Sequence, residues 1–319
     1  ERTTQAILNL LDFDFFKLLD SVTIARSRKH IQTFYDTTAI GQFPTRLKPL
    51  SYRTPLSNDK QAVTLNRIYA ELSLIKMAVY APVTYIFPSA LRKYEEIFDT
   101  LVEGKGRLKQ VDRERSLQAL MTVNLLKRLE SSIHAFRLTL TFLEKNISNV
   151  IAKIDDFDAR AADDEVSIAP LMGYDQDENG ELLNPEDLIG NKLKIHLADM
   201  DRLSWRMDLD GDREIIKGLL RMIATIDTKN DAKLQHVKSH IIEKLQDPIN
   251  PGNHKVIIFT AFADTANYLY ENIAPFLLEN YGLHSAKITG NDNTSTIKTR
   301  VKSRQSYDMQ GLLTLFSPK

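Results

Sequence analysis

Two short loops near the carboxyl end of the chain, 260–263 and 289–293, each begin with a threonine and follow a predicted strand. The apolar run 256–259 before the first loop is continuous, which is typical of a parallel strand buried on both faces. A second short strand at 286–289 leads into the other loop. Ligands of parallel sheets bind at the carboxyl ends of strands, so these loops are the candidate binding positions. The alternative is a strand, helix and strand unit that binds no ligand.

The segment between the two strands carries the signals of a helix. Asp264 can cap its first turn. Leu269, Ile273 and Leu277 recur at helical spacing, and Gly282 ends the pattern. A right-handed crossover is the default for a strand, helix and strand connection, so this part of the chain predicts a parallel α/β unit.

An acidic stretch contains the spacing of a calcium loop. Five residues match the pattern D-x-[DN]-x-[DN]-G-x5-E, whose oxygen atoms bind calcium in an EF-hand: Asp175, Asp177, Asn179, Gly180 and Glu186. Pro185 stands directly before the last of them, and no second loop is present for pairing. A solvated acidic loop is therefore preferred over a calcium site.

Two histidines have the spacing of helical metal ligands. His236 and His240 lie four residues apart, which places both imidazoles on one face of a helix. Val237 occupies the position of the glutamate in the H-E-x-x-H motif of zinc proteases. A surface pair is therefore preferred over a zinc site, and no resident metal is expected.

The groups that perform phosphoryl transfer are missing from this sequence. The nearest approach to G-x-x-x-x-G-K-[ST] is at Gly104, Lys105 and Gly106, but Asp99 replaces the first glycine and no hydroxyl follows the lysine. Such a loop cannot surround nucleotide phosphates and place a hydroxyl on magnesium. No D-E-x-[HD] motif is present to hold the metal. The chain is therefore expected not to hydrolyse ATP by itself.

Several segments resemble Swi/Snf-type superfamily-two helicases. DAKLQHVKSHIIEKL followed by KVIIFTAF resembles the start of their second RecA-like lobe, and HSAKITG resembles the next strand of that lobe. VTIARSRKHI with FPTRLKP resembles the end of the first lobe. LMTVNLLKRLESSIHAFRLTL resembles a helical segment between the lobes of bacterial relatives. The resemblance implies a middle fragment of a larger motor, with a first-lobe tail at 1–44, a helical insertion at 45–230 and a second-lobe start at 231–319.

The same resemblance implies a nucleic-acid site. In the family, a Thr-Gly pair that ends the second strand touches a backbone phosphate, which corresponds here to Thr289 and Gly290. Thr260 can donate a hydroxyl hydrogen bond to a phosphate. Arg300 can bind a phosphate through two N–H groups of its guanidinium. DNA is expected in preference to RNA. ATP and magnesium are implied for the complete protein, with no cofactor in this chain.

The clearest periodicity belongs to a long apolar stripe with alternating spacings of three and four residues. Its members are Leu126, Leu129, Ile133, Phe136, Leu140, Leu143, Ile147, Val150 and Ile154. It predicts one helix over 114–154, about 60 Å long at 1.5 Å per residue. The apolar positions of 216–226 could pack against it as an antiparallel hairpin. A plain helical bundle, self-association, or a protein partner bound through 126–154 are the alternatives.

Composition is compatible with these expectations. The 319 residues carry 42 basic and 42 acidic side chains, so the net charge makes no case for nucleic acid. The charges are uneven, since 155–187 holds twelve acidic residues against Arg160 alone. There is no cysteine, and no run approaches the length of a membrane span. An intracellular, cytoplasmic protein without membrane contact is expected.

The predicted fold class is mixed and mainly α-helical with a partial α/β part. It comprises a long helical insertion, an acidic loop near 155–191 and an incomplete RecA-like parallel sheet. The predicted function is part of an ATP-dependent helicase or double-strand DNA translocase. The alternative is a non-catalytic helical module that binds a protein partner. Trp205, the single tryptophan, is expected to pack against a helix rather than to stack on a base.

Overall fold

The computed structural model describes most of the chain after residue 46. The described residues are 31, 47–98, 100–102, 106–108, 110–160, 165–167, 194–248, 251–290, 292–298 and 307–317. The chain divides into two compact units, Glu1–Arg53 and Thr54–Lys319. All elements described below belong to the second unit. Apart from residue 31, the predicted first-lobe tail at 1–44 lies outside the described residues, as do the calcium-like spacing at 175–186 and Arg300.

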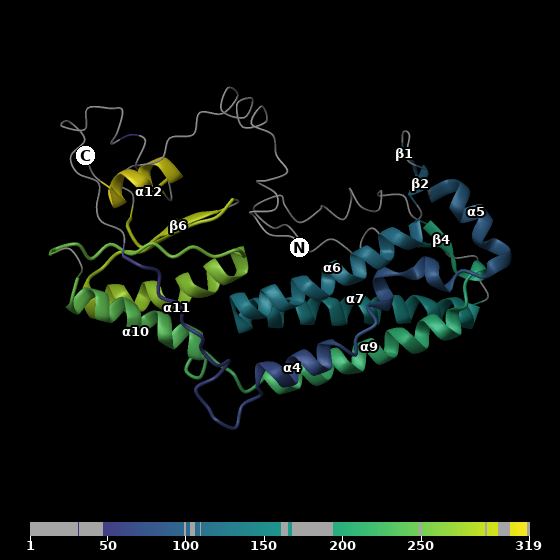
Figure 1. Ribbon diagram of the computed structural model, residues 1–319, viewed down its shortest axis with the longest axis horizontal. Helices are drawn as coiled ribbons and strands as arrows, with labels where there is room; N and C mark the ends of the chain where they lie inside the picture. Colours follow the sequence, from purple (N-terminus) through teal and green to yellow (C-terminus); the bar gives the residue numbers. More distant parts are fainter. Residues whose placement is uncertain are drawn as a thin grey trace, which may run out of the picture. The chain divides into compact units, whose positions relative to one another are not determined.

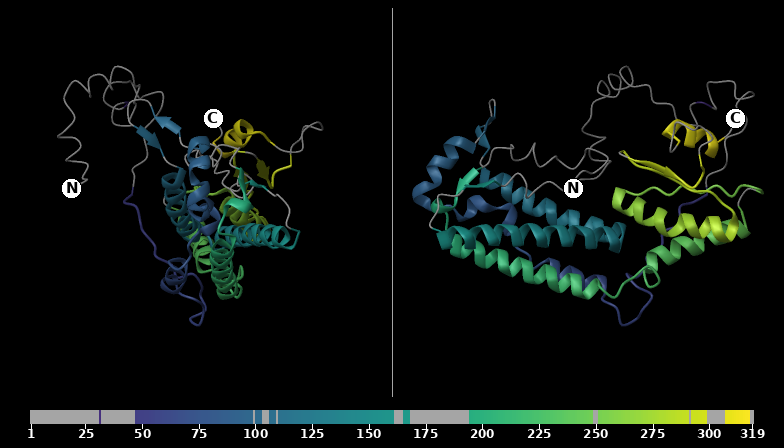
Figure 2. Two further views of the ribbon diagram at one scale, coloured as in Figure 1. Left: turned by 90° about the vertical axis from the view of Figure 1, so that its right-hand side faces the viewer. Right: turned by 180° about the vertical axis from the view of Figure 1, so that it is seen from behind.

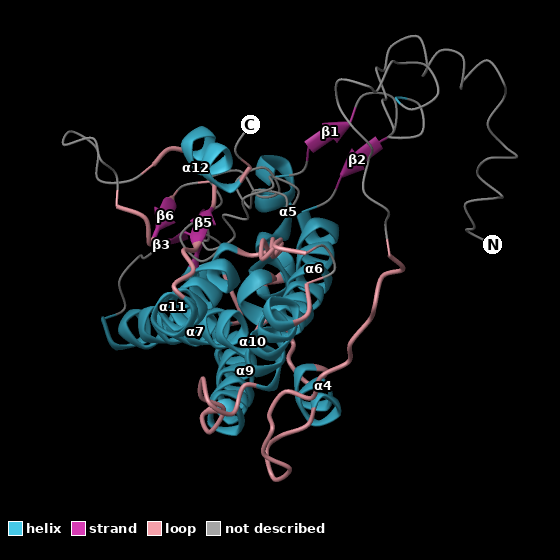
Figure 3. Ribbon diagram, turned by 90° about the vertical axis from the view of Figure 1, so that its left-hand side faces the viewer, coloured by secondary structure: helices cyan, strands magenta, loops and turns pink. Residues whose placement is uncertain are grey.

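Helices make up most of the second unit (Figures 1 and 3). The α-helices are α4 Leu65–Leu72, α5 Pro88–Phe98, α6 Gln110–Ser131, α7 Ile133–Arg160, α9 Arg202–Ile223, α10 Ala232–Gln246, α11 Ala263–Tyr281 and α12 Met309–Phe316. Short 3-10 helices are η1 Ala78–Tyr80, η2 Pro82–Tyr85 and η4 Leu197–Asp199. Among the described residues, three antiparallel pairs join β1 Thr100–Val102 to β2 Gly106–Leu108, β3 Glu165–Ser167 to β4 Lys194–His196, and β5 Ala286–Ile288 to β6 Asn293–Ser295. The mainly helical class is confirmed.

Helices α6, α7 and α9 lie side by side (Figures 1 and 2). Helices α7 and α9 run antiparallel, because contacts join opposite ends of the two helices. Arg202 at the start of α9 binds Asp158 near the end of α7 at 2.9 Å. Arg137 near the start of α7 donates to the carbonyl oxygens of Ile223, the last residue of α9, and of Ile226 just after it. The predicted packing of 216–226 against the apolar stripe is therefore confirmed.

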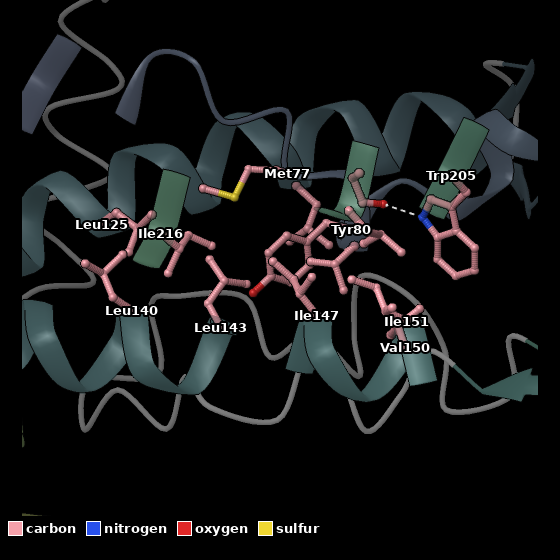
Figure 4. Packing of buried hydrophobic residues seen from close by; sticks show 14 of the residues in the cluster. Met77, Tyr80, Leu125, Leu140, Leu143, Ile147, Val150, Ile151, Trp205 and Ile216 are labelled. Atoms are coloured by element: carbon pink, nitrogen blue, oxygen red, sulfur yellow. Dashed lines mark hydrogen bonds between the residues drawn. The ribbon is translucent and has the colours of Figure 1, made fainter. Parts of the chain in front are cut away.

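The stripe forms the core of this bundle (Figure 4). Phe136, Leu140 and Ile154 are fully buried, and Ile216 from α9 lies among the same core residues. Trp205 is also fully buried, and its Nε1 donates to the carbonyl oxygen of Ala78 at 3.1 Å. The expectation that Trp205 packs in the helical part is confirmed.

The prediction of one helix over 114–154 is wrong, because the helix breaks at Ser132. The Oγ of Ser132 accepts a hydrogen bond from the Ala135 amide at 3.0 Å and so caps α7. Leu125 on α6 and Leu140 on α7 then lie close together in the core (Figure 4). The chain folds back at Ser132, and α6 covers part of the stripe that a straight helix would expose. A protein partner bound through 126–154 would have to displace α6 and α9.

Two buried carboxylates hold the segment 76–86, which contains η1 and η2, against the bundle. Asp212 on α9 accepts hydrogen bonds from the amides of Lys76 and Ala78, at 2.7 and 2.8 Å. Glu114 on α6 accepts one from the amide of Val83 at 3.1 Å. These three amides lie in or just before the first turns of η1 and η2, where a helix offers them no partner, and the carboxylates accept their hydrogen bonds. Burial raises the pKa of Asp212 above its usual range, while the two amide donors oppose this shift.

The prediction for α11 is confirmed in its core and its end. Ile273 and Leu277 are buried, and Gly282 ends the helix in the left-handed region with φ 65°. The capping residue is not Asp264, as the sequence predicted. Phe262 occupies the N-cap without a side-chain hydrogen bond, and Asp264 lies in the first turn.

The parallel sheet expected around 256–259 is absent from the part of the chain that the structure describes. Residues 253–260 have no assigned strand, and Ile257 and Phe259 are 62% and 91% exposed. Strand β5 instead pairs antiparallel with β6. A strand buried on both faces needs neighbouring strands and covering layers, and none pairs with 256–259 among the described residues. The prediction of a buried strand is wrong for this structure.

The other boundaries differ in detail. Helix α7 continues to Arg160, so the acidic loop predicted near 155–191 begins later than expected. Residues 155–160 therefore belong to α7, and two ion pairs join them to α9: Arg206 with Asp155 at 2.6 Å and Arg202 with Asp158 at 2.9 Å. None of the described helices combines the length and apolarity needed to cross a membrane.

Replacing Asp212 tests the role of the buried carboxylate. Asp212→Asn leaves a single acceptor oxygen for two amides, so we expect the free energy of unfolding to fall by about 1–3 kcal/mol. Urea unfolding followed by Trp205 fluorescence measures this. Asp210→Asn is the matched control on the same helix, where only surface ion pairs are lost and the change should stay below about 1 kcal/mol. Equal effects of the two substitutions would contradict this role.

Replacing Phe259 tests the exposure of the extended segment. Because Phe259 is 91% exposed, Phe259→Ala should change the free energy of unfolding by less than about 0.5 kcal/mol. Phe136→Ala, at a fully buried position, should cost about 3–5 kcal/mol. Urea unfolding followed by circular dichroism compares them. A cost at Phe259 similar to that at Phe136 would mean that this run is buried in the protein.

Candidate nucleic-acid interface

Thr260 lies in the short loop between the extended segment and α11. Its side chain is half-buried, and its Oγ1 donates to the carbonyl oxygen of Phe262 at 2.7 Å. This bond stabilises the bend into the helix, as local hydroxyl-to-backbone bonds commonly do. The same hydroxyl can reach a phosphate only after it rotates away from Phe262.

Thr289 and Gly290 lie in the tight turn between β5 and β6. The Oγ1 of Thr289 donates to the carbonyl oxygen of Asp292 at 2.8 Å and accepts from the amide of Asp292 at 3.0 Å. The amide of Thr289 also donates to that carbonyl at 2.9 Å. Gly290 is exposed at this turn. Thr289 is half-buried, and its hydroxyl already forms hydrogen bonds within the turn.

The charges beside the turn nearly balance. Lys287 binds the carboxylate of Asp292 at 2.7 Å, and Asp292 also accepts from Thr294 at 3.0 Å. The hydrogen bond from Lys287, followed by that from Thr294, holds the pKa of Asp292 below its usual range. Asp292 is therefore ionised at neutral pH. A phosphate at this turn would need Lys287 to offset the carboxylate.

The structure brings the two loops to the same end of α11. Lys287 on β5 donates to Asn267, which lies in the second turn of α11. The turn that follows β5 therefore lies toward the amino end of α11, where the Thr260 loop also lies. Figure 1 places the tip of the β5–β6 hairpin and the start of α11 on the same side. Arg300, the fourth predicted site residue, lies outside the described residues.

One cluster at this end of α11 was not predicted from the sequence. Arg128, near the end of α6, has only 4% of its side chain exposed and binds Asp264 at 2.8 Å. Its guanidinium lies 4.8 Å from the centre of the Phe262 ring. Asp264 is 136 residues away from Arg128 in the chain. Nothing in the local sequence around either residue could have indicated the pair.

Further contacts surround the pair of Arg128 and Asp264. Ser131 and Ser132 place their hydroxyls 2.7 and 2.9 Å from the hydroxyl of the buried Thr265. The rings of His134 and Tyr268 stack with centroids 4.8 Å apart. We name this set of contacts between the α6–α7 turn and the start of α11 the hairpin joint.

The two candidate metal ligands remain a pair. His236 and His240 lie on α10 with ring centroids 6.2 Å apart. His240 is within 3.3 Å of Glu243. Within the described ranges, no group of three or more histidine, aspartate or glutamate side chains is arranged to hold a metal ion.

Comparisons of the chain with protein-family models, with curated proteins and with solved structures gave no match. Function is therefore inferred from the residues and their contacts.

The Thr289 hydroxyl provides a local test of the turn. Thr289→Val keeps the shape of the side chain but removes both hydroxyl bonds to Asp292, so we expect the Asp292 amide to exchange faster with solvent. Thr289→Ser keeps the hydroxyl and serves as the control. Amide hydrogen exchange measured by NMR compares the three proteins. Unchanged exchange in Thr289→Val would mean that the backbone alone holds the turn.

Proposed function

We propose that this chain is part of an ATP-dependent helicase or double-strand DNA translocase of the Swi/Snf type. It would contribute backbone phosphate contacts near Thr260 and the Thr289–Gly290 turn, together with a helical insertion. The observation that carries this proposal is the largely exposed run 256–259, which is followed by α11 and then by β5.

The exposed run supports an incomplete parallel sheet. Burying one large apolar side chain contributes about 1.5–3 kcal/mol, so a folded domain seldom leaves three such residues in a row in water. Ile257, Ile258 and Phe259 would be covered if neighbouring strands and a helical layer from the rest of a RecA-like lobe packed on them. The order of extended segment, helix and strand is the one such a lobe requires.

The position of the two loops gives independent support. Both lie toward the amino end of α11, which is where the carboxyl ends of strands lie in a parallel α/β unit. A translocase contacts the nucleic-acid backbone through small hydroxyls, amides and a few cations, and it does not need base readout. DNA is preferred over RNA in this proposal, and the protein would act inside the cell.

The helical bundle agrees with the proposal of a helical insertion. Helices α6, α7 and α9 have a continuous core of their own, so this part can fold around itself between two lobes. The predicted rival, a module that binds a partner through 126–154, loses its free surface because α6 and α9 already cover the stripe.

ATP and magnesium belong to the complete protein in this proposal. The residues present do not fit them, because the sequence lacks the phosphate loop and the described part holds no cluster of metal-binding side chains. Hydrolysis would require motifs supplied from outside this chain.

The salt dependence of DNA binding tests the proposed contacts. We expect weak binding whose affinity falls steeply as salt rises, since each phosphate contact contributes about 0.9 to the logarithmic slope. Arg300→Gln should reduce that slope by about one. Arg221→Gln, at an exposed position of the bundle, is the control and should leave the slope unchanged. No binding at low salt, or equal slopes for both variants, would contradict the proposal.

The enzymatic part needs a longer protein. Any longer product of the same reading frame should hydrolyse ATP faster when DNA is added, whereas the 319-residue chain should show no turnover. Turnover by the short chain, or no stimulation of the longer one by any nucleic acid, would overturn the motor proposal.

A further inference from the structure

The Thr260 loop is connected to the helical bundle by a short series of contacts. The hydroxyl of Thr260 binds the carbonyl oxygen of Phe262 at 2.7 Å. The ring of Phe262 lies beneath the guanidinium of Arg128, which also binds Asp264 at 2.8 Å. Arg128 therefore contacts both residues that lead from this loop into α11.

The geometry of these contacts restricts movement of the loop. Phe262 is 6% exposed and takes the N-cap position of α11 without a side-chain hydrogen bond of its own. A ring held under a planar guanidinium has a fixed position, and a carboxylate bound to the same guanidinium fixes the first turn. Lysine could not replace arginine here, because an ammonium cannot lie flat on a ring while binding a carboxylate.

Further contacts, from both α11 and α10, locate this restraint at the tip of the α6–α7 hairpin. Ser131 and Ser132 lie within hydrogen-bond distance of Thr265. Lys233 at the start of α10 donates to the carbonyl oxygens of Glu130 and Ser131. The carbonyl groups at the end of α6 and the first turns of α10 and α11 thus meet at one place.

We propose that Arg128 is a positioning residue, through which the α6–α7 hairpin sets the conformation of the Thr260 loop. Movement of the hairpin would then change the loop without any change in its sequence. The consequence for nucleic-acid contacts rests on the proposed function, whereas the restraint on the loop does not.

A spin label in the loop tests the restraint without nucleic acid. The sequence contains no cysteine, so Ala261→Cys gives one attachment site on an exposed residue of the loop. Arg128→Gln should narrow the central line of the nitroxide spectrum at 261, because the label gains mobility. A label at Glu279→Cys, on an exposed position near the far end of α11, should keep its line width.

Two further variants make the result specific. Asp264→Asn removes the charge from the other side of the contact and should also narrow the line at 261. It replaces Arg128→Gln if loss of that buried arginine unfolds the bundle, which Trp205 fluorescence would reveal. Arg137→Gln is the matched control on the same hairpin, since its guanidinium binds carbonyl oxygens at the end of α9 and just after it. It should leave the label at 261 unchanged.

The proposal is overturned if the line at 261 keeps its width in both Arg128→Gln and Asp264→Asn. It is also overturned if the labels at 261 and 279 gain mobility equally, or if Arg137→Gln has the same effect as Arg128→Gln. Each of these results would mean that the hairpin does not restrain this loop specifically.

A double-mutant cycle, with DNA affinity as the readout, separates this proposal from the proposed function. If Arg128 acts through Thr260, Arg128→Gln should weaken DNA binding less in a Thr260→Ala background than in the unchanged protein. Additive losses would overturn the positioning role in binding. Absence of DNA binding by the unchanged chain would contradict the proposed function only, and the spin-label result would still decide the restraint.

Discussion

Burial of one apolar stripe organises the helical part of this protein. The stripe on α7 has apolar side chains at nearly every turn, from Ile133 to Ile154, and a single helix cannot cover it. Helix α6 folds back over one side of it, α9 runs antiparallel over another, and Tyr80 and Met77 from the segment 76–86 fill the remaining space (Figure 4). Because the core is continuous, the positions of these helices depend on one another.

The buried carboxylates in this core accept hydrogen bonds from the backbone of 76–86. Residues 76–86 pass over the bundle with two short 3-10 helices and no α-helix, and Met77 adopts the left-handed region with φ 55°. The amides of Lys76, Ala78 and Val83 would be unsatisfied without the carboxylates of Asp212 and Glu114. Buried carboxylates at these positions therefore define the path of the segment, and an apolar residue of similar size could not do so.

The carboxyl-terminal part has a smaller apolar core than the bundle. Helices α10 and α11 share a small core, while the neighbouring run 256–259 stays largely exposed. The hairpin joint connects this part to the bundle through charged, hydroxyl and aromatic contacts. Such contacts are directional, and they can hold a loop in one conformation more specifically than apolar packing does. The helical bundle and the loops at the start of α11 are thus linked by specific residues.

Much of the helical architecture was determined by the sequence itself. Periodicity is local, so the spacing of apolar residues located α9 and α11 and paired α9 with α7, and Gly282 marked the end of α11 correctly. Thr289 and Gly290 were also placed correctly in a turn, because strand ends and glycine are local signals. The hydrogen bonds of the Thr260 and Thr289 hydroxyls were not predictable, since they depend on the geometry of the turns.

Three features were decided only by the tertiary structure. Ser132 interrupts a pattern that is consistent with one straight helix, because folding back buries more of the stripe than extension would. The run 256–259 has the composition of a buried strand, but burial requires neighbours that are not paired with it here. The contact between Arg128 and Asp264 joins residues far apart in the chain. Local propensity carries no information about such distant partners, and only the folded chain brings them together.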